Sequence, residues 1–423
     1  MNNYGYPYLG QVERKSKLFN NRERFLLLVL LLASMHFYLY GLHIMIVAFV
    51  FTCVLSGRIH YVDGLFAPAL LSVALLFFWK NSLDGPSTIT KWMVWPMAFL
   101  MGYEMTGMET LDMEGAEKLE KKVRWYMLIV ALGFFIHFAL NFYINRGASD
   151  LGRNTMDYWS KDIKAATGQA AQAGIPLGWC VASFINNNSF IKKIPAVIGL
   201  GVILLYNLVL STRTIFLMVL LVTLVAIIYL VSTADKAQKK TYTVLTVVVV
   251  LILAAIAYQM NLFNLQAHIE ESEFYSRFFK KGSQDISEDT RFDNKLKHLQ
   301  YLPLALWGGD RIRPVVGGYA HDLFLDLHND AGILAFIASI MMVCGSMGIL
   351  RRLLRNKNVR FETKMTMLCV FTAIYMEFMV EPIFAGAPEV LMMFCFLYGM
   401  INRMDRNLTQ LQLAEAETSE KDE

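Results

Sequence analysis

Runs of apolar residues about as long as a bilayer is thick recur along the whole chain, and they constrain the fold more than any other feature. A membrane-spanning helix needs roughly 20 predominantly apolar residues. Hydrophobic residues make up 56% of the 423 residues and charged residues only 17%. A soluble core cannot bury that much apolar surface, so we expect lipid to be the solvent for most of the chain.

The apolar runs predict an all-α polytopic membrane protein with about twelve spans. The first two runs are short and are expected to form a hairpin that turns near Tyr40 and Gly41. The tenth run is too long for one simple crossing, so its start is expected to lie in the interface as a helix outside the hydrocarbon. The predicted spans cover residues 25–40, 41–57, 64–80, 88–106, 125–143, 171–187, 194–210, 214–232, 241–262, 319–350, 365–381 and 386–403.

The basic residues orient these spans. An even number of spans puts both termini on one side, which then receives 24 of the 39 Lys and Arg. The other side receives 15, and eight of those lie in the single long loop 263–318. Because the positive-inside rule counts short loops, both termini are predicted to be cytoplasmic. The 24 residues are Arg14, Lys15, Lys17, Arg22, Arg24, Arg58, Lys118, Lys121, Lys122, Arg124, Lys192, Lys193, Lys236, Lys239, Lys240, Arg351, Arg352, Arg355, Lys357, Arg360, Lys364, Arg403, Arg406 and Lys421.

This topology divides the chain into five parts in an inner (plasma) membrane. They are a cytoplasmic tail 1–24, spans one to nine at 25–262, a large exported loop 263–318, spans ten to twelve at 319–403, and a cytoplasmic tail 404–423. The large loop is expected to be partly helical, over 270–280 and 290–302, and a second exported loop covers 144–170. No short apolar segment with a cleavage site follows the basic N-terminus, so the first span is expected to stay in the membrane.

Several residues that can carry chemistry are more simply explained by packing or solvation. The cysteines all fall in apolar runs without a C-x-x-C pair, which favours buried thiols over disulfides or a zinc site. Histidines in or near other spans are interpreted as hydrogen-bonded packing residues, and glutamates near span ends as interfacial. These residues are Cys53, Cys180, Cys344, Cys369, Cys395, His36, His43, His60, His137, Glu104 and Glu377. Glu381, which precedes Pro382, ends a predicted span on the exported side and is expected to rim a cleft there.

Three arginines are predicted to lie on the exported side. Arg213 occupies a very short turn between two strongly apolar runs, where it either contacts an anion or extends to lipid head groups. Arg153 and Arg291 lie in the two exported loops, where each is either a solvated charge or a further anion contact. Together the three guanidinium groups can offset most of the charge of a pyrophosphate.

A histidine-rich segment, GGYAHDLFLDLHNDAGI, opens the tenth predicted span. His321 and His328 are two helical turns apart, which predicts that they share a helix face, with Asp322 and Asp326 on a neighbouring face. An imidazole can accept a proton near neutral pH, so His321 is a candidate general base. The alternative is an interfacial helix with ordinary polar caps. The spacing matches no familiar metal motif, and no metal or other cofactor is predicted.

The order of these motifs resembles the O-antigen ligase and Wzy-type polysaccharide polymerase superfamily. The order is an outer-loop Arg, S-x-R at a helix junction, T-R in the late loop, LPLALWGGD, and then AHDLFLDLHNDAGI, over roughly residues 145–335. His321 and Gly332 keep the ligase spacing, but Asp322 and Ala335 depart from the ligase pattern and favour a polymerase. The resemblance implies a GT-C-like fold and a metal-independent integral-membrane glycosyltransferase.

The resemblance also implies the roles of the site residues. His321, Arg213 and Arg291 would be catalytic, and Arg153, Asp322 and His328 would bind substrate. The donor would be an undecaprenyl-pyrophosphate-linked oligosaccharide, transferred to the next lipid-linked repeat unit. Membrane lipid, a chain-length regulator and a flippase are the other expected partners, and nucleic acid is not. A ligase that acts on lipid A core, a lipid-oligosaccharide flippase or other transporter, and a scaffolding protein are the alternatives.

Overall fold

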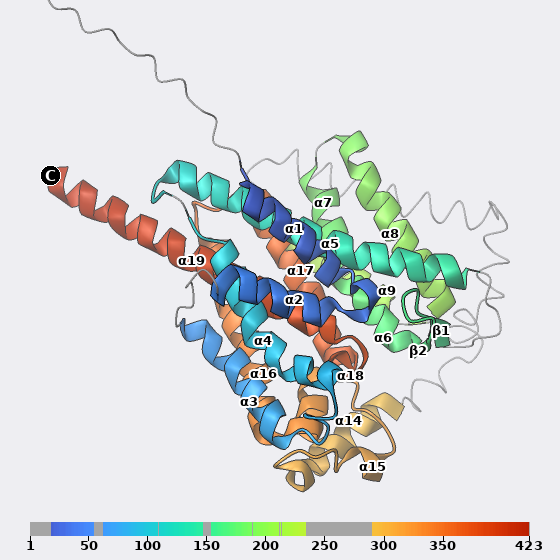
Figure 1. Ribbon diagram of the computed structural model, residues 1–423. Helices are drawn as coiled ribbons and strands as arrows, with labels where there is room; N and C mark the ends of the chain where they lie inside the picture. The colour runs from blue at the N-terminus through green and yellow to red at the C-terminus, as the bar shows by residue number, and fades with distance from the viewer. Residues whose placement is uncertain are drawn as a thin grey trace, which may run out of the picture.

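The computed structural model describes residues 18–54, 62–108, 110–146, 154–187, 189–210, 212, 214–233 and 290–422, and these are mostly helical (Figure 1). The helices are α1 (Asn21–Ser34), η1 (Phe37–Leu39), α2 (Gly41–Phe49), η2 (Val50–Val54), η3 (Asp63–Leu65), α3 (Phe66–Phe78), α4 (Pro86–Met105), α5 (Met113–Asn145), α6 (Ala166–Ala170), η4 (Ala171–Ala173), α7 (Gly174–Asn186), α8 (Phe190–Leu210), α9 (Thr214–Thr233), α14 (Thr290–Gln300), η7 (Leu302–Ala305), α15 (Arg313–Val316), α16 (Leu323–Arg355), α17 (Phe361–Val380), α18 (Ile383–Gly386) and α19 (Pro388–Asp422). The strands β1 (Asn154–Met156) and β2 (Ile163–Ala165) form an antiparallel hairpin in which Thr155 pairs with Lys164. The sequence analysis did not predict this hairpin.

Four of the described helices are long and apolar enough to cross a membrane, namely α5, α9, α16 and α17. Shorter apolar helices cover Gly41–Val54 and Asp63–Phe78. The expectation of a helical membrane protein is confirmed at this level. The predicted ninth span, 241–262, and the expected helix at 270–280 lie outside the described residues.

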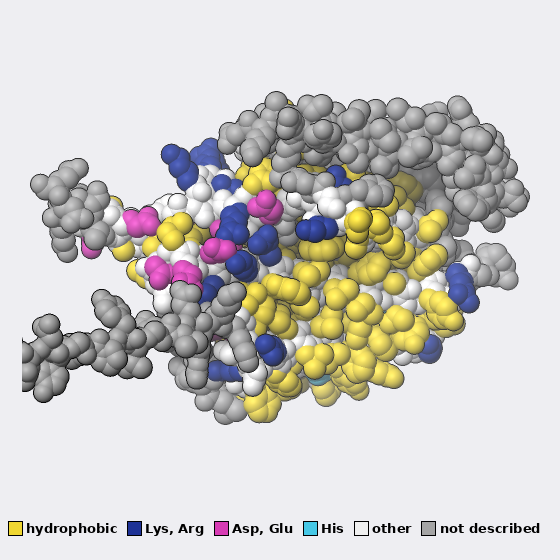
Figure 2. Space-filling view, turned by 90° about the horizontal axis from the view of Figure 1, so that it is seen from above, with side chains coloured by type: hydrophobic (Ala, Val, Ile, Leu, Met, Phe, Trp, Pro, Cys, Tyr) yellow, Lys and Arg dark blue, Asp and Glu magenta, His cyan; other side chains and the backbone are white. Residues whose placement is uncertain are grey.

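The surface of the helices agrees with lipid contact. On α9, one stripe is buried (Ile215, Met218, Val222, Ala226 and Leu230), and an equally apolar stripe is exposed (Leu217, Leu220, Leu224, Ile228 and Val231). A helix that is apolar on all sides is typical of contact with lipid. Figure 2 shows a broad hydrophobic face, with most of the visible charged side chains gathered toward the end from which the C-terminal helix projects.

Helix starts follow local capping signals. Asn20 caps α1 by accepting from the Glu23 backbone N–H, and the Glu23 carboxylate accepts from the Asn20 N–H in return, both at 2.9 Å. This reciprocal pair satisfies two donors that a helix leaves open at its start. Asp112 caps α5 by accepting from Gly115 N at 2.7 Å, and Pro86 begins α4 where its missing N–H costs nothing.

Close backbone contact joins α4 to α19. A Cβ atom added at Gly102 would lie 1.9 Å from the Phe396 carbonyl oxygen, and one added at Gly399 would lie 1.9 Å from that of Phe99. Only glycine allows this approach, which small residues commonly provide between helices in membranes. Helices from the two ends of the sequence therefore pack as neighbours in one core, together with the pairs α1–α5, α3–α16 and α7–α17.

The helices α1, α2, α4 and α5 have their ends at two places, so α1 and α5 run opposite to α2 and α4. Residues from α1, η2, α4 and α5 meet at one end of the molecule, which we call the Lys122 end: Glu23, Thr52, Glu104 and Lys122 line one cavity there. Residues from the opposite ends of α2 and α4 meet at the His36 end, where His43 and Lys91 line another cavity. The expected hairpin near Tyr40 and Gly41 is confirmed as a turn at residues 35–40 between the helices α1 and α2.

Helix α16 is broken near its start. Gly332 has φ 79° and ψ −170°, a conformation almost restricted to glycine, and Ala331 is also non-helical. The backbone groups freed by the break bond to the preceding loop: Ile333 N donates to Leu306 O at 2.9 Å and Gly309 N donates to Asp330 O at 3.1 Å. The first turns of α16 therefore point in a different direction from the rest of the helix. They are held in place by hydrogen bonds to the loop segments that follow η7.

Candidate functional site

A cavity of about 560 Å³ opens at the His36 end of the molecule. Its walls come from segments far apart in sequence: the α1–α2 turn, the start of α4, the β2–α6 region, residues 319–321, and the α18–α19 junction. The polar groups that line it include His36, His43, Lys91, Lys164, His321 and Glu389, and Leu39, Leu42, Pro382 and Pro388 give it an apolar wall. A concave site with an apolar wall and a few convergent polar groups is typical of ligand binding.

The α1–α2 turn that forms one wall is strained. His36, Tyr38 and Leu39 have φ values of 51°, 47° and 67°, in the left-handed region that residues with a Cβ rarely adopt. Such conformations persist only where surrounding contacts enforce them. Here the rings of Phe37 and Tyr38 both contact Trp159, at centroid distances of 5.1 and 5.0 Å, and Trp159 donates to Met35 O at 3.3 Å.

Glu389, at the start of α19, is the acidic group of the cavity. It is buried, accepts a hydrogen bond from Gln172 Nε2 at 2.9 Å, and lies 3.9 Å from His36 Nδ1. The His36 ring stacks on the His137 ring at 6.2 Å, and His137 Nε2 lies 3.2 Å from Oδ2 of Asp157. Asp157 in turn pairs with Lys164 at 3.3 Å, so a continuous polar chain runs from the cavity into the exposed loop.

Asp157 stays ionised in this chain. Burial alone raises the pKa of a carboxyl, but the His137 hydrogen bond, the Ser160 backbone N–H and the charge of Lys164 together hold the pKa of Asp157 below its usual value. Its Oδ1 also accepts from Trp159 N and Ser160 N, both at 3.0 Å. The Lys164 charge is therefore largely neutralised by Asp157.

Lys91 is the cation of the cavity that has no such partner. It comes from the second turn of α4 and is partly buried, and among the described residues no carboxylate lies within ion-pairing distance of its Nζ. Its Nζ lies 6.0 Å from the centre of the Trp79 ring, and the carboxylates of Glu389 and Asp330 act on its charge from beyond ion-pairing distance. A partly buried ammonium without a carboxylate partner is uncommon, because burying an unpaired charge is costly.

The structure separates the residues that the sequence analysis grouped. His321 lines the cavity with φ 54°, but it precedes α16, whose N-cap is Asp322. The prediction that His321 and His328 share a helix face is therefore wrong. His328 is buried beyond the first turn, with its ring 5.8 Å from the Phe336 ring.

The two aspartates of this segment hold its backbone. Asp322 accepts from Phe324 N and Leu325 N and lies 3.6 Å from Lys295 Nζ, while Asp326 accepts from Ala320 N at 3.0 Å. Arg291 lies in the first turn of α14, partly exposed. Arg153 and Arg213 lie outside the described residues.

The sequence analysis missed most of the cavity. It assigned His36, His43 and His137 to packing and did not single out Lys91, Lys164 or Glu389. One signal was available: Lys91 lies just inside an apolar run that was read as a span, and ionisable residues in such runs are rare and often functional.

A comparison with family models gives one finding. Residues 167–309 match the family described as Peptidase M50B-like. The matched segment is 143 of the 423 residues, counted from 167 to 309 inclusive, so it shows similarity over about a third of the chain. No curated protein matches the sequence.

This match overturns the resemblance drawn from the motifs. It points to a different family from the O-antigen ligase and Wzy-type superfamily, so that assignment is wrong. The predictions that depended on it are corrected too: polysaccharide polymerase, ligase, and metal-independent glycosyltransferase activity. The GT-C-like fold loses its basis for the same reason. Each motif was short, and their order alone did not identify a family.

The residues of this chain do not fit the zinc site of a membrane metallopeptidase. Such sites commonly take two histidines from H-E-x-x-H on one helix, with the glutamate as base. None of the eight histidines is followed by glutamate, and no two are four residues apart. Among the described residues, no group of three His, Cys, Asp or Glu side chains is placed to hold a metal ion.

Proposed function

We propose that this protein is a membrane-embedded binding protein for an anionic amphipathic ligand, held in the cavity at the His36 end. The observation that carries the proposal is Lys91, a partly buried ammonium that faces this cavity with no carboxylate partner among the described residues. A phosphate or carboxylate of the ligand supplies that partner. The apolar wall of Leu39, Leu42 and Pro382 accommodates the hydrocarbon part.

The other polar groups give the site its selectivity. The hydrogen bond from Gln172 fixes the Glu389 carboxylate in the cavity wall. This carboxylate repels an anionic head group that lies next to Glu389 instead of next to Lys91. His36, His43 and His321 can donate to or accept from hydroxyl groups of the ligand. The predicted undecaprenyl-pyrophosphate-linked oligosaccharide belongs to this chemical class and stays a prediction as a ligand.

We also propose the full topology of twelve spans, with the His36 end exported and both termini cytoplasmic. The directions of four helices support it, because α1 and α5 run opposite to α2 and α4. Helices α1 to α5, α7 to α9, α16, α17 and α19 supply eleven crossings, and residues 241–262 supply the remaining one. The same proposal includes the five parts of the chain expected from the sequence, with boundaries after residues 24, 262, 318 and 403.

Calorimetric titration of the purified protein in neutral detergent tests the binding function. The probes are octyl phosphate, octanoate and octanol, which share a chain and differ in the head. We expect the two anions to bind and octanol to bind at least about tenfold more weakly, since one ion pair in a partly desolvated site contributes on the order of 1.4 kcal/mol. Lys91→Met removes the preference.

Lys80→Met is the matched control, because Lys80 is an exposed lysine close to the start of α4. It leaves the preference for anions unchanged. Equal binding of octanol and octyl phosphate to the unaltered protein, or an equal loss in both variants, contradicts the proposal.

The second candidate function is hydrolysis of a peptide bond at the membrane, and the match of residues 167–309 favours it. A quenched fluorescent peptide with an apolar segment, added to the reconstituted protein, tests this candidate. Cleavage that a zinc chelator abolishes supports it and contradicts our reading of the metal-ligand residues. If the peptide is not cleaved and anions bind at Lys91, the results favour the binding function over peptide hydrolysis.

A further inference from the structure

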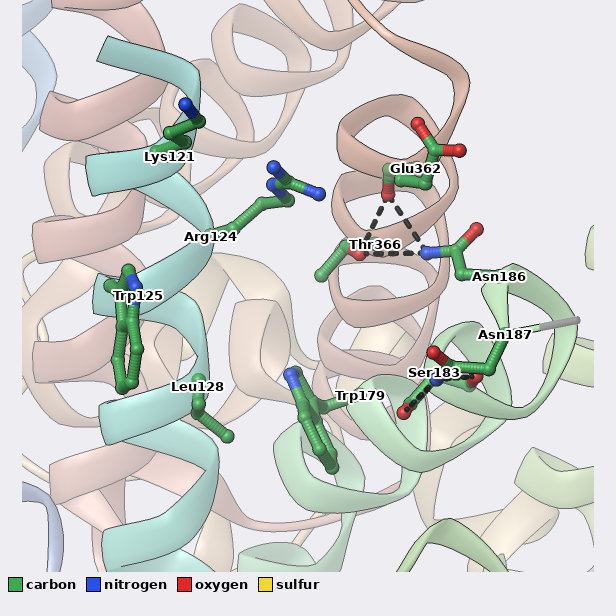
Figure 3. A pocket seen from close by; sticks show the side chains of 10 residues that line it. All are labelled: Lys121, Arg124, Trp125, Leu128, Trp179, Ser183, Asn186, Asn187, Glu362 and Thr366. Carbon is green, nitrogen blue, oxygen red and sulfur yellow. Dashed lines mark hydrogen bonds between the residues drawn. The ribbon is translucent and has the colours of Figure 1, made fainter. Parts of the chain in front are cut away.

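A second pocket, at the Lys122 end, has no part in the proposed binding function. It has a volume of about 270 Å³ and lies between α5, α7 and α17. In Figure 3, Lys121 and Arg124 on α5 lie across from Glu362 on α17 in the upper part of the view, and Trp125, Leu128 and Trp179 lie below them.

Arg124 is the cation of this pocket that lies outside the ion pairs of the described residues, and its charge acts on the Glu120 carboxylate one turn earlier on α5. Its neighbour Lys121 pairs with Glu117 at 2.7 Å, and Glu117 also pairs with Arg360 at 2.6 Å. Among the described residues, Arg124 forms no ion pair. Its guanidinium extends from α5 into the space between α5 and α17 (Figure 3), and a planar guanidinium matches the oxygens of a phosphate.

The amide side of the pocket is held rigid by hydrogen bonds. Asn186 Nδ2 donates to Glu362 O at 3.0 Å and to Thr366 Oγ1 at 3.3 Å, which fixes the orientation of the amide and joins the end of α7 to α17. Its Oδ1 is buried and points away from Arg124 (Figure 3). Arg124 is therefore the group of this pocket that a charged ligand meets.

The indole rings place the pocket at the membrane surface. Trp125 is 45% exposed, next to Arg124 on α5, and tryptophan is enriched where lipid head groups meet hydrocarbon. Helix α5 continues from there into one of the four apolar spans. A ligand whose phosphate meets Arg124 therefore has its apolar part beside Trp125, Leu128 and Trp179.

We infer that this pocket binds the head group of an anionic phospholipid, with the phosphate diester on Arg124. A diester carries a single negative charge, which suits one guanidinium that forms no ion pair among the described residues. Phosphatidylglycerol is such a lipid, because its phosphate diester is its only charge. Basic pockets between spanning helices on the cytoplasmic side commonly recognise anionic lipids, and the positive-inside rule predicts that this end is cytoplasmic.

Fluorescence quenching by brominated lipids tests the inference in reconstituted full-length protein. The vesicles contain phosphatidylcholine with a small fraction of either brominated phosphatidylglycerol or brominated phosphatidylcholine. We expect the brominated anionic lipid to quench tryptophan more, with a relative association about fivefold in its favour. Replacing both Trp125 and Trp179 by Phe removes the difference, which assigns it to this pocket.

Two matched variants separate the pocket from general surface charge. Arg124→Gln abolishes the preference, and Arg124→Lys keeps part of it. Arg351→Gln, which removes an exposed arginine from the same end of the molecule, leaves it unchanged. Thermal unfolding of each variant checks that it remains folded.

Several outcomes overturn the inference. Equal quenching by the two brominated lipids in the unaltered protein does so, and so does an equal loss in the Arg124 and Arg351 variants. Added inorganic phosphate distinguishes the source of the phosphate. If it removes the preference while potassium chloride of the same ionic strength does not, the pocket takes soluble phosphate and the lipid assignment is wrong.

Discussion

Asp157 shows how much one buried side chain can organise at the His36 end. Its carboxylate meets His137 on α5, Lys164 on β2, and the backbone of Trp159 and Ser160 in its own turn. These contacts fix the hairpin loop against the helices, and the same loop presents Lys164 to the cavity. Loss of the charge at Asp157 is therefore expected to destabilise the fold and to change the position of Lys164 in the cavity wall.

The first prediction concerns Asp157 and pH. We expect Asp157→Asn to lower the free energy of unfolding at pH 7 by about 3 kcal/mol, because a buried ion pair is broken. The folded-state pKa of Asp157 lies below that of the unfolded chain. Its stabilisation is thus fully present above about pH 4 and is lost as the pH falls toward the folded-state pKa. The difference in unfolding free energy between the unaltered protein and Asp157→Asn must therefore become smaller as the pH is lowered.

Thermal unfolding in detergent from neutral pH down to acid measures this difference. Asp162→Asn in the same loop is the control, since Asp162 is exposed and its change is expected to matter little. A difference that stays constant or grows on acidification contradicts the assignment of a lowered pKa to Asp157.

At the scale of elements, the break in α16 decides what faces the cavity. Asn329 bridges the break: its Oδ1 accepts from Ile312 N at 2.8 Å, and its Nδ2 donates to Asp310 at 2.8 Å. Arg313 pairs with Asp330 at 2.6 Å, and its guanidinium lies 4.0 Å from the centre of the Tyr319 ring, which lines the cavity. A continuous helix would leave these groups without their partners.

The second prediction tests that break with two glycines of the same helix. Gly332→Ala introduces a Cβ 2.6 Å from the Leu306 carbonyl oxygen in a backbone conformation that alanine avoids. We expect a loss of about 3 kcal/mol in unfolding free energy, from strain and overpacking together. A Cβ at Gly348 meets nothing within 4 Å, so Gly348→Ala is neutral or stabilises by up to about 1 kcal/mol.

Denaturant unfolding of the two variants in mixed micelles gives this comparison. If both substitutions change the unfolding free energy equally, Gly332 does not have a positive φ in the protein. The hydrogen bond from Ile333 N to Leu306 O at the break is then not formed either.

At the scale of the whole molecule, the two ends differ in chemistry. The Lys122 end gathers ion pairs such as Lys122–Glu23 at 2.7 Å and Arg352–Asp405 at 2.7 Å. The His36 end carries the aromatic turn, the hairpin and the larger cavity. The exposed apolar stripe of α9 lies between them and identifies the part of the surface that contacts hydrocarbon.

The third prediction tests the orientation. In intact cells, a membrane-impermeant maleimide should label Asp162→Cys, in the hairpin loop, without permeabilisation. It should label Lys357→Cys, between α16 and α17, only after permeabilisation. Four of the five native cysteines are buried, and the unaltered protein measures the background from Cys344. Labelling in the reverse order would place the His36 end in the cytoplasm and contradict the charge argument.

The sequence by itself determined the elements, because their signals are local. Apolar runs separated by charge predict helices in lipid, and the α1–α2 turn ends at Tyr40 and Gly41, where it was expected. The start of α5 was not predicted, because the helix begins at Met113 and runs through a charged stretch ahead of the predicted span 125–143. The expected helix at residues 290–302 is present as α14 and the start of η7 for the same reason. Short motifs were a weaker guide, since a few matching residues identified the wrong family.

Only the tertiary structure decided which residues share a cavity. His36, Lys91, Lys164, His321 and Glu389 come from five separate segments, and no periodicity relates positions that distant. The break in α16 likewise depends on hydrogen bonds to a loop that precedes it, so the pattern of the helix alone suggested a shared face for His321 and His328 that does not exist. Local pattern governs local backbone, whereas a site arises from packing between distant parts of the chain.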